Sequence, residues 1–262
     1  MRTTVVTGSA SGIGRATTDL LRSRGQQVIG VDLHDADVVA DLSTVHGRLE
    51  LVRAVDALSH GRIDGVVANA GVAQDTPADV AVNFFGALAT LEGLRPLLLG
   101  SPAPRAVLTA CLAILMPSDQ ELVDLCLALD EPGALARAEK LVEAREGGVA
   151  YASSKVALCQ WMRRHADADA WAGSGIPLNA VAPGVVESPM MARLLGTEFQ
   201  QAQMEAEVPM PLNGFMTPAV PARLLAWLVS EENTHLCGQV VFVDGGAEVV
   251  IRRDTTWGAG RD

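Results

Sequence analysis

Short apolar runs rich in β-branched residues alternate with helical patterns along the chain, and this alternation constrains the fold more than any other feature. The runs do not alternate with polar residues, as is typical of strands buried on both faces. They are TTVVTG (3–8), QVIGVD (27–32), VVADLS (38–43), IDGVVANAG (63–71), RAVLTAC (105–111), PLNAVAPG (177–184) and QVVFVDGG (239–246). The pattern predicts an α/β fold over residues 1–262, a single domain with one doubly wound parallel sheet flanked by helices.

One segment, at about 116–147, does not fit a minimal strand–helix repeat. Ser118 and Glu121 predict a capping box, followed by one helix and then a second from about Ala134 that the glycines at 147–148 should end. We expect this helical-hairpin insertion to be acidic outside and apolar on one face. A partner subunit or the mouth of an active site would have to cover that face.

A second segment, at about 187–217, is predicted to be a substrate loop. It holds most of the chain's eight methionines, namely Met190, Met191, Met204, Met210 and Met216. Methionines of this kind ordinarily fill gaps in a core. Beside a catalytic crevice they would instead form an adaptable apolar wall.

Charge and cysteine usage exclude several classes of protein. A formal net charge of −11 and a pI of about 4.9 argue against nucleic acid or an anionic membrane as partner. The four cysteines form no C-x-x-C pair, so we expect no metal site and at least three reduced, buried thiols. The N-terminus lacks an apolar signal core and no apolar run is long enough to span a bilayer, which indicates a cytoplasmic protein.

A glycine-rich turn, TGSASGIG (7–14), directly follows the first predicted strand and opens a helix. Gly8, Gly12 and Gly14 would allow a tight turn and bring backbone N–H groups close to a pyrophosphate. The turn lacks the G-K-[ST] ending of a nucleotide-hydrolysing P-loop, which disfavours ATP. This strand–turn–helix context therefore predicts a dinucleotide site.

An acid at the end of the second predicted strand indicates which dinucleotide would bind. Asp32 would accept hydrogen bonds from an adenosine ribose and repel a 2′-phosphate. No arginine or lysine stands at the positions of Ser11, Leu33 and His34 to hold such a phosphate. We therefore expect NAD(H) in preference to NADP(H), although a solvated acid at a strand end is the simpler alternative for Asp32.

The single tyrosine of the chain, Tyr151, lies four residues before Lys155 in GVAYASSKVAL (148–158). On a helix the two side chains share one face. A nearby ammonium favours the phenolate and lowers the pKa of a tyrosine from about 10. The pair is either an acid/base with its electrostatic partner or a packed aromatic beside a solvated lysine.

Together these motifs resemble the short-chain dehydrogenase/reductase family over essentially the whole chain. The matching residues are TGSASGIG (7–14), Asp32, Asp41-Leu42, Asn69-Ala70-Gly71, Asn83 in VNFFG, Tyr151-x-x-x-Lys155, and Pro183-Gly184 with Ser188. The narrower resemblance is to the bacterial 3α-hydroxysteroid dehydrogenase/carbonyl reductases, which carry a helical insertion before the tyrosine helix.

The resemblance implies an NAD-binding Rossmann-type domain with assigned roles. Tyr151 would be the acid/base, Lys155 would also bind the nicotinamide ribose, and Asn83 would hold the water of a proton relay. The cofactor-binding residues would be Gly8, Ser11, Gly12, Ile13, Gly14, Asp32, Leu33, Asp41, Leu42, Asn69, Ala70, Gly71, Tyr151, Lys155, Pro183, Gly184, Val186 and Ser188.

One position departs from the family pattern. Where a serine usually polarises the substrate carbonyl, the strand AVLTACLAI places Cys111, and a thiol is a weaker hydrogen-bond donor than a hydroxyl. Losing one good hydrogen bond to a developing oxyanion costs about 1–3 kcal/mol. Cys111 could serve as a weak donor, Thr109 or Ser118 could replace it, or the protein could turn over slowly or not at all.

The expected function is an NAD-dependent dehydrogenase or carbonyl reductase that interconverts a secondary alcohol and a ketone on a small apolar, cyclic or steroid-like substrate. The alternative is a catalytically weak NAD-binding regulatory or scaffold protein, because Cys111 replaces the serine. The family implies a homodimer or homotetramer. The C-terminal IRRDTTWGAGRD (251–262) would be a loose tail or would cap the pocket.

Overall fold

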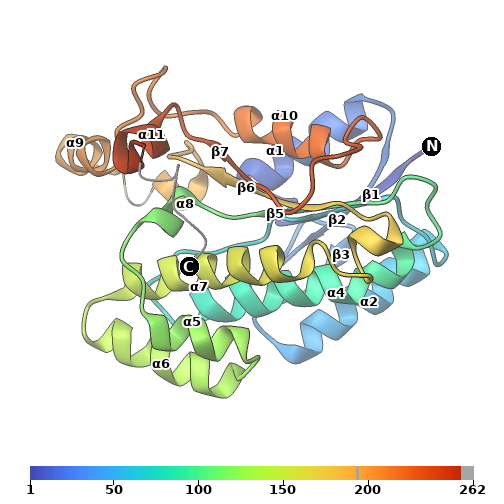
Figure 1. Cartoon of the computed structure of the whole chain (residues 1–262), viewed down its shortest axis with the longest axis horizontal. Coiled ribbons are helices and arrows are strands. Elements are labelled where there is room, and N and C mark those ends of the chain that lie inside the picture. Colours follow the sequence, from blue (N-terminus) through green and yellow to red (C-terminus); the bar gives the residue numbers. More distant parts are fainter. Residues whose placement is uncertain (193–194, 255–262) are drawn as a thin grey trace.

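The computed structural model describes residues 1–192 and 195–254, so the predicted tail beyond residue 254 lies outside the described residues. Seven strands form one parallel sheet in the order β3-β2-β1-β4-β5-β6-β7, which confirms the predicted doubly wound topology (Figure 1). The strands are β1 (Thr3–Thr7), β2 (Gln27–Asp32), β3 (Val38–Val39), β4 (Gly65–Ala68), β5 (Arg105–Thr109), β6 (Leu178–Pro183) and β7 (Val240–Val243). The predicted strand at 38–43 pairs only through β3, and from Ala40 onward the chain leaves the sheet.

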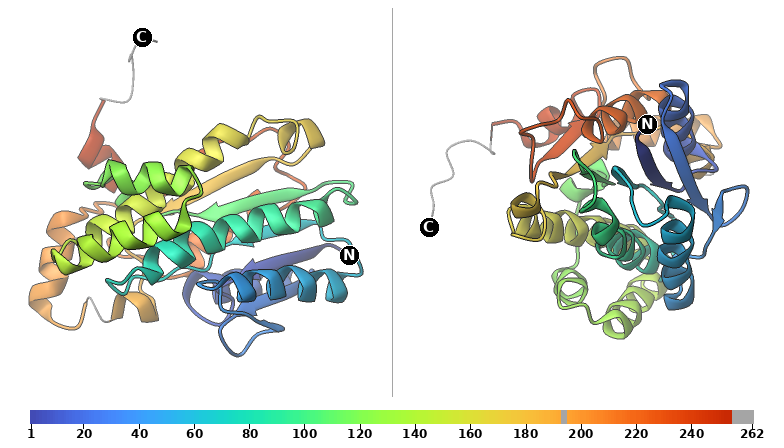
Figure 2. Two further views of the ribbon diagram at one scale, coloured as in Figure 1. Left: turned by 90° about the horizontal axis from the view of Figure 1, so that it is seen from below. Right: turned by 90° about the vertical axis from the view of Figure 1, so that its right-hand side faces the viewer.

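Helices cover both faces of the sheet. On one face lie α1 (Gly12–Ser23) and α10 (Ala219–Leu228), which pack against each other. On the other lie α2 (Val45–Ser59), α4 (Ala87–Leu98) and α7 (Gly147–His165), as two further views show (Figure 2). Among the described residues, no helix combines the length and the apolar character needed to cross a bilayer.

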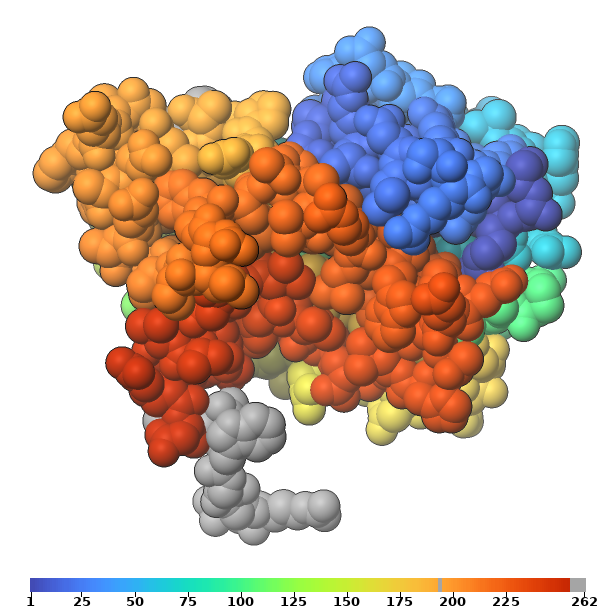
Figure 3. Space-filling view, turned by 90° about the horizontal axis from the view of Figure 1, so that it is seen from above, coloured from blue at the N-terminus to red at the C-terminus, as the bar shows by residue number. Residues whose placement is uncertain are grey.

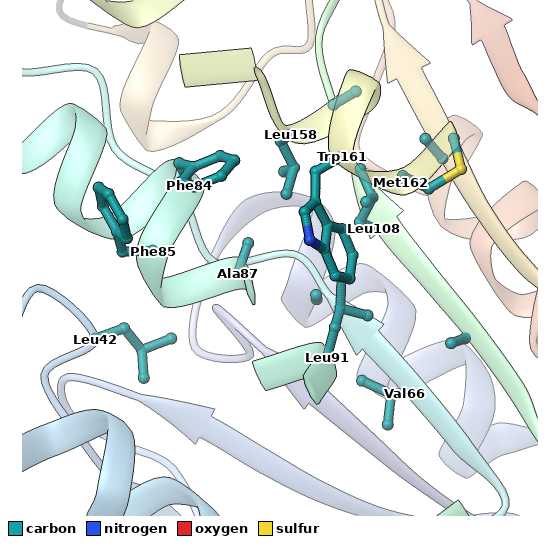
Figure 4. Close-up of a cluster of buried hydrophobic side chains, with 14 of the residues drawn as sticks. Leu42, Val66, Phe84, Phe85, Ala87, Leu91, Leu108, Leu158, Trp161 and Met162 are labelled. Atoms are coloured by element: carbon teal, nitrogen blue, oxygen red, sulfur yellow. The ribbon is translucent and has the colours of Figure 1, made fainter. Parts of the chain in front are cut away.

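The larger core lies between the sheet and the layer of α2, α4 and α7. Leu91, Leu108 and Leu158 are fully buried there around Trp161, and Phe84 and Phe85 extend the cluster toward Leu42 (Figure 4). At roughly 1.5–3 kcal/mol for each large apolar side chain removed from water, this cluster holds α4 and α7 firmly on the sheet. The sheet is therefore a rigid support for groups at the strand ends.

Two helices, α5 (Gln120–Leu127) and α6 (Glu131–Glu143), form the helical hairpin (residues 119–143). The predicted capping box is wrong: the N-cap of α5 is Asp119, whose carboxylate accepts the Leu122 N–H at 2.8 Å. The helix α6 begins before Ala134, because Asp130 caps it by accepting the Gly133 N–H. The glycines at 147–148 do not end α6 but open α7.

The apolar face of the hairpin is covered within the subunit. Leu122, Val123 and Cys126 of α5 are buried, and α5 packs along α7 (Figure 1). Ser153 of α7 accepts the Asp119 N–H at 2.8 Å, which fixes the start of α5 to the helix that carries Tyr151. The expectation that a partner subunit or the mouth of an active site must cover this face was therefore wrong.

The carboxyl ends of the parallel strands meet at one edge of the sheet, and most of the remaining elements gather there. At this edge the chain passes through α3 (Ala78–Val80), the π-helical turn η1 (Ala81–Gly86) and the 3-10 turn η2 (Leu112–Leu115). Another 3-10 turn, η3 (Ala172–Ser174), lies between α7 and the start of β6, away from this edge. Two short helices, α8 (Pro189–Ala192) and α9 (Glu198–Glu207), lie in the predicted substrate loop. Figure 3 shows this loop beside α11 (Ala247–Arg252) at one end of the molecule.

Candidate active site

A cavity of about 310 Å³ opens at the carboxyl edge of the sheet. Of the predicted site residues, all line it except Gly14 and Asn83. Those that do are Gly8, Ser11, Gly12, Ile13, Asp32, Leu33, Asp41, Leu42, Asn69, Ala70, Gly71, Cys111, Tyr151, Lys155, Pro183, Gly184, Val186 and Ser188. Residues that are far apart in the sequence thus meet at one site because parallel crossovers return every strand end to the same edge.

The glycine-rich turn runs from β1 into α1. Gly8 has φ +70°, in the left-handed region that favours glycine. A Cβ placed on Gly14 would lie 2.0 Å from the carbonyl oxygen of Gly8, so Gly14 serves the close packing of turn against helix. The first backbone N–H groups of α1 have no hydrogen-bond partner within the helix, and they lie at its cavity end, where they would attract a phosphate.

Strand β2 ends at Asp32, and backbone N–H groups of the glycine-rich turn and of the next residue orient its carboxylate. One oxygen accepts the Ala10 N–H at 2.9 Å, and the other accepts the Leu33 N–H at 2.7 Å. Among the described residues that line the cavity, Lys155 is the only basic one, and it lies at the opposite end with Tyr151. The Asp32 end of the cavity is therefore acidic, without a cation to bind an additional phosphate.

Helix α7 brings Tyr151 and Lys155 to the cavity on one face, as the spacing predicts. The Lys155 ammonium donates to the carbonyl of Thr109 at 3.1 Å and lies 6.0 Å from the centre of the Tyr151 ring. The Tyr151 hydroxyl has the thiol of Cys111 as its neighbour, and both residues line the cavity. The phenol, the ammonium and the thiol thus form one cluster at the ends of β5 and α7.

Burial controls the protonation of this cluster. It raises the pKa of Tyr151 well above the ordinary value of 10.0, and the neighbouring Cys111 raises it further. Burial also lowers the pKa of Lys155 from its ordinary 10.5. The predicted lowering of the Tyr151 pKa by Lys155 is therefore not the net effect in this structure, because desolvation of the phenolate is larger.

The cysteines divide into two pairs. All four are free, and burial raises the pKa of both Cys126 and Cys159 to about 12. Cys111 and Cys237 are only half-buried, so the expectation of at least three buried thiols was wrong. Within residues 1–192 and 195–254, no three histidine, cysteine or acidic side chains come together as metal ligands would.

Neither hydroxyl considered as a substitute for Cys111 is free to act. The Thr109 hydroxyl donates to the Asn69 side-chain oxygen at 3.0 Å. Ser118 is exposed and does not line the cavity. Cys111 is therefore the side chain that meets Tyr151 at the end of β5.

Asn83 is buried on η1, whose wider turn interrupts the α-helical path between α3 and α4. Its amide accepts the Val72 N–H at 2.9 Å and donates to the Val72 carbonyl at 2.9 Å. A Cβ on Gly71 would lie 2.9 Å from the Asn83 side-chain oxygen, so only glycine fits there. Both polar atoms of the Asn83 side chain hold this loop, and its role in a water relay stays a prediction.

Sequence reasoning missed Asp79, a buried acid on α3. Its carboxylate accepts the N–H groups of Gln74 and Asp75 at 2.9 and 3.1 Å and so ties down the loop above the cavity. Burial raises its own pKa, and its negative charge raises the pKa of both Tyr151 and Lys155. In the sequence, Asp79 is an ordinary acid at a helix start, and only the tertiary structure places it near the pair.

The methionines of the predicted substrate loop lie in two environments. Met190 and Met191 line the cavity, which fits the predicted apolar wall. Met210 and Met216 are buried in a separate cluster, where the Met210 sulfur accepts the Val185 N–H at 3.3 Å. Because Val185 lies between Gly184 and Val186, two residues of the cavity wall, Met210 supports that wall from behind.

Known proteins resemble this chain over nearly its full length. A family model described as short chain dehydrogenase matches residues 2–122, and one described as Enoyl-(Acyl carrier protein) reductase matches residues 134–248. The 3-alpha-hydroxysteroid dehydrogenase/carbonyl reductase of Comamonas testosteroni is 35% identical, covering 95% of this chain and 97% of that protein.

Solved structures agree with this similarity. The 3-alpha-hydroxysteroid dehydrogenase from Pseudomonas sp. B-0831, complexed with NADH, has a TM-score of 0.86 and 38% identity, covering 95% of this chain and 98% of that one. A putative NAD(P) dependent gluconate 5-dehydrogenase from Beutenbergia cavernae, with bound NADP, has a TM-score of 0.74 and 26% identity, covering 95% and 97%. The chain therefore belongs to the short-chain dehydrogenase/reductase family and is an oxidoreductase acting on CH–OH donors.

Proposed function

We propose that the protein interconverts a secondary alcohol and a ketone with NAD(H) as cofactor and an apolar, cyclic or steroid-like molecule as substrate. The observation that carries the proposal is the cluster of Tyr151, Cys111 and Lys155 in a cavity that is also lined by Asp32. One end offers a proton donor beside a cation, and the other offers a ribose-binding acid.

The residues present fit a nicotinamide dinucleotide. Close packing requires glycine at Gly14 and Gly71, and the turn leaves backbone donors for a pyrophosphate. Asp32 supports NAD(H) rather than NADP(H), since a carboxylate would repel a 2′-phosphate and no base lies beside it. The NADH in the Pseudomonas enzyme points in the same direction, and the NADP in the Beutenbergia enzyme in the other.

When bound, the cofactor supplies or accepts the hydride at the substrate carbon. In ketone reduction, the Tyr151 hydroxyl gives its proton to the substrate oxygen as charge develops there. Burial raises the pKa of Tyr151 and so makes its hydroxyl a weaker acid, which means that proton transfer depends on the Lys155 ammonium stabilising the phenolate. The Lys155 ammonium stabilises the phenolate that is left on Tyr151. The Cys111 thiol donates a weak hydrogen bond to the substrate oxygen. In alcohol oxidation the same groups act in reverse.

The proposed substrate class is inferred from the side chains that line the cavity. Met190, Met191 and Val186 give it an apolar side near Tyr151, and no charged side chain of the described part faces the substrate there apart from Lys155. Apolar walls with a few placed polar groups suit ligands such as cyclic ketones. The name of the Comamonas relative supports the steroid-like end of this class.

The alternative, a catalytically weak NAD-binding regulatory or scaffold protein, is not favoured, because the similar proteins are named dehydrogenases and reductases. A homodimer or homotetramer in the cytoplasm remains part of the proposal. The apolar face of the hairpin gives this part of the proposal no support, since α7 already covers that face.

A paired measurement tests the proposal. NADH and NADPH are titrated by nucleotide fluorescence, and NADH oxidation is then followed with a panel of cyclohexanones, bicyclic ketones and 3-oxosteroids. We expect tighter binding of NADH and turnover on at least one cyclic ketone. Tight NADH binding without turnover on any ketone would instead support the non-catalytic alternative, and tighter NADPH binding would overturn the cofactor assignment.

A further inference from the structure

One buried arginine joins three parts of the chain that lie far apart in the sequence. Arg48, on α2, is 8% exposed and donates through Nε to the Leu42 carbonyl at 2.8 Å. Its Nη2 donates to the Ala81 carbonyl at 3.0 Å. Its two terminal nitrogens also bind the two carboxylate oxygens of Glu131, each at 2.7 Å.

One of these partners lines the cavity, and a second begins the turn that carries Asn83. Leu42 lines the cavity, next to Asp41, at the end where Asp32 lies. Ala81 is the first residue of η1, the turn that carries Asn83. The third partner, Glu131, is the first residue of α6 in the helical hairpin and takes no part in the cavity.

The segment held by Arg48 has little room to adjust. A Cβ on Gly86 would lie 3.0 Å from the Leu42 Cβ, and one on Gly47 would lie 2.0 Å from the Asp41 carbonyl oxygen. Leu42 lies with Phe85 in the core cluster (Figure 4), and the Arg48 guanidinium lies 5.7 Å from the centre of the Phe85 ring. A small change in the position of Arg48 would therefore move the cavity wall.

The carboxylate of Glu131 fixes that position. A buried guanidinium is stable only when paired, and a planar fork bound by two carboxylate oxygens has one preferred orientation. Without the charge of Glu131, Arg48 would turn toward solvent for hydration and weaken its bonds to Leu42 and Ala81. The ion pair thus transmits the placement of α6 to the Leu42 wall.

We infer that Arg48 and Glu131 are positioning residues that make the helical hairpin part of the adenosine end of the cofactor site. The inference rests on the proposed binding of NAD(H). It assigns the hairpin a role inside its own subunit, because Glu131 is the hairpin's ion-pair contact to the wall that Leu42 forms. Neither residue touches the reacting atoms, so both act through Leu42.

The test compares Glu131→Gln with Glu139→Gln in the full-length protein. Both remove one acid from α6, but Glu139 is exposed on its outer side. Binding of NADH is measured by fluorescence, and ADP-ribose, which lacks the nicotinamide, is measured by competition. Thermal unfolding of each variant confirms that it is folded at the temperature of the titration.

We expect Glu131→Gln to raise the Kd of NADH and of ADP-ribose by the same factor, about 3- to 10-fold, and Glu139→Gln to change neither. Arg48→Lys should weaken both ligands at least as much, because an ammonium cannot hold Leu42 and both Glu131 oxygens together. The double variant Arg48→Lys/Glu131→Gln should then bind no more weakly than Arg48→Lys alone.

Three results would overturn the inference that Arg48 and Glu131 position the cofactor site. Equal Kd values for Glu131→Gln and Glu139→Gln would overturn the inference while leaving the proposed function intact. A weaker NADH affinity with unchanged ADP-ribose affinity would place the effect at the nicotinamide end and overturn the assignment to the adenosine end. If the wild-type protein binds neither ligand, the proposed function itself fails, and the inference fails with it.

Discussion

The hydroxyl of Tyr151 on helix α7 lies next to the thiol of Cys111, at the end of strand β5, on the wall of one cavity. The two residues are forty positions apart in the chain, and Lys155 joins the same pair of elements through the Thr109 carbonyl. A thiol therefore occupies the place where a hydroxyl would be the stronger donor to a developing oxyanion. The first prediction follows from this contact.

Cys111→Ser should retain or raise the rate of ketone reduction. A serine hydroxyl can donate a normal hydrogen bond to the substrate oxygen, so we expect a rise in kcat of up to about 10-fold. The measurement is steady-state NADH oxidation on the best ketone of the panel. Cys237→Ser, which changes a half-buried thiol far from the cavity, is the control, and a large loss of activity in Cys111→Ser would show that the thiol is specifically required.

Tyr151→Phe should abolish turnover while leaving NADH binding nearly unchanged. The variant removes the proton donor but keeps the ring, and general acid catalysis contributes about 10²- to 10⁴-fold. Single-turnover absorbance and fluorescence titration separate the two effects. Activity equal to that of the wild-type protein would rule out Tyr151 as the acid/base.

Asp32→Asn should narrow the preference for NADH over NADPH. The substitution keeps the size of the side chain but removes the charge that repels a 2′-phosphate, so we expect the ratio of the two Kd values to fall about 10-fold or more. Asp35→Asn, a neighbouring exposed acid outside the cavity, is the control. An unchanged ratio would mean that Asp32 does not determine which cofactor binds.

The pKa of Tyr151 can be read directly, because it is the only tyrosine in the chain. Burial and Cys111 raise this pKa, so the phenolate absorbance of the cofactor-free protein should appear only well above pH 10, whereas the unfolded protein should titrate near 10. Since the folded state keeps this proton longer, the contribution of Tyr151 to stability is present below pH 10 and is lost as the pH rises through the folded-state value.

Asp79→Asn should lower the midpoint of the same titration. Removing the negative charge of Asp79 makes the phenolate less unfavourable. The N–H groups of Gln74 and Asp75 bind different oxygens of Asp79, so the single amide oxygen of asparagine can accept only one of them, and the fold of the variant has to be checked. An unchanged or higher midpoint, with the fold intact by circular dichroism, would contradict the assigned effect of Asp79.

Asp119→Ala should destabilise the protein by about 1–3 kcal/mol in urea unfolding at neutral pH, because it removes the cap of α5 and the ion pair with Arg137. Arg137 holds the pKa of Asp119 below 3.8. The stabilisation is therefore complete above that ordinary value and declines as the pH falls through the lower folded-state value. Asp124→Ala, on the exposed side of the same helix, is the control and should cost much less.

The sequence by itself determined the sheet and most of the cavity. Periodicity requires only neighbouring residues, so apolar β-branched runs predicted buried parallel strands, and chirality then brought their carboxyl ends to one edge. The i, i+4 spacing of Tyr151 and Lys155 placed both on one face of α7 in the same way. The shared edge explains why Asp32 and Ser188, far apart in the chain, line one cavity.

Only the tertiary structure decided what depends on contacts between distant segments. The element that covers the apolar face of the hairpin could not be predicted, because an apolar helix face shows that something packs against it but not which element does. In the structure that element is α7. The direction of the Tyr151 pKa shift was mistaken because spacing reveals the nearby ammonium of Lys155 but not the burial that outweighs it. Arg48 and Asp79 read as ordinary surface charges in the sequence, and they acquire their roles because the fold removes them from water beside Leu42 and Tyr151.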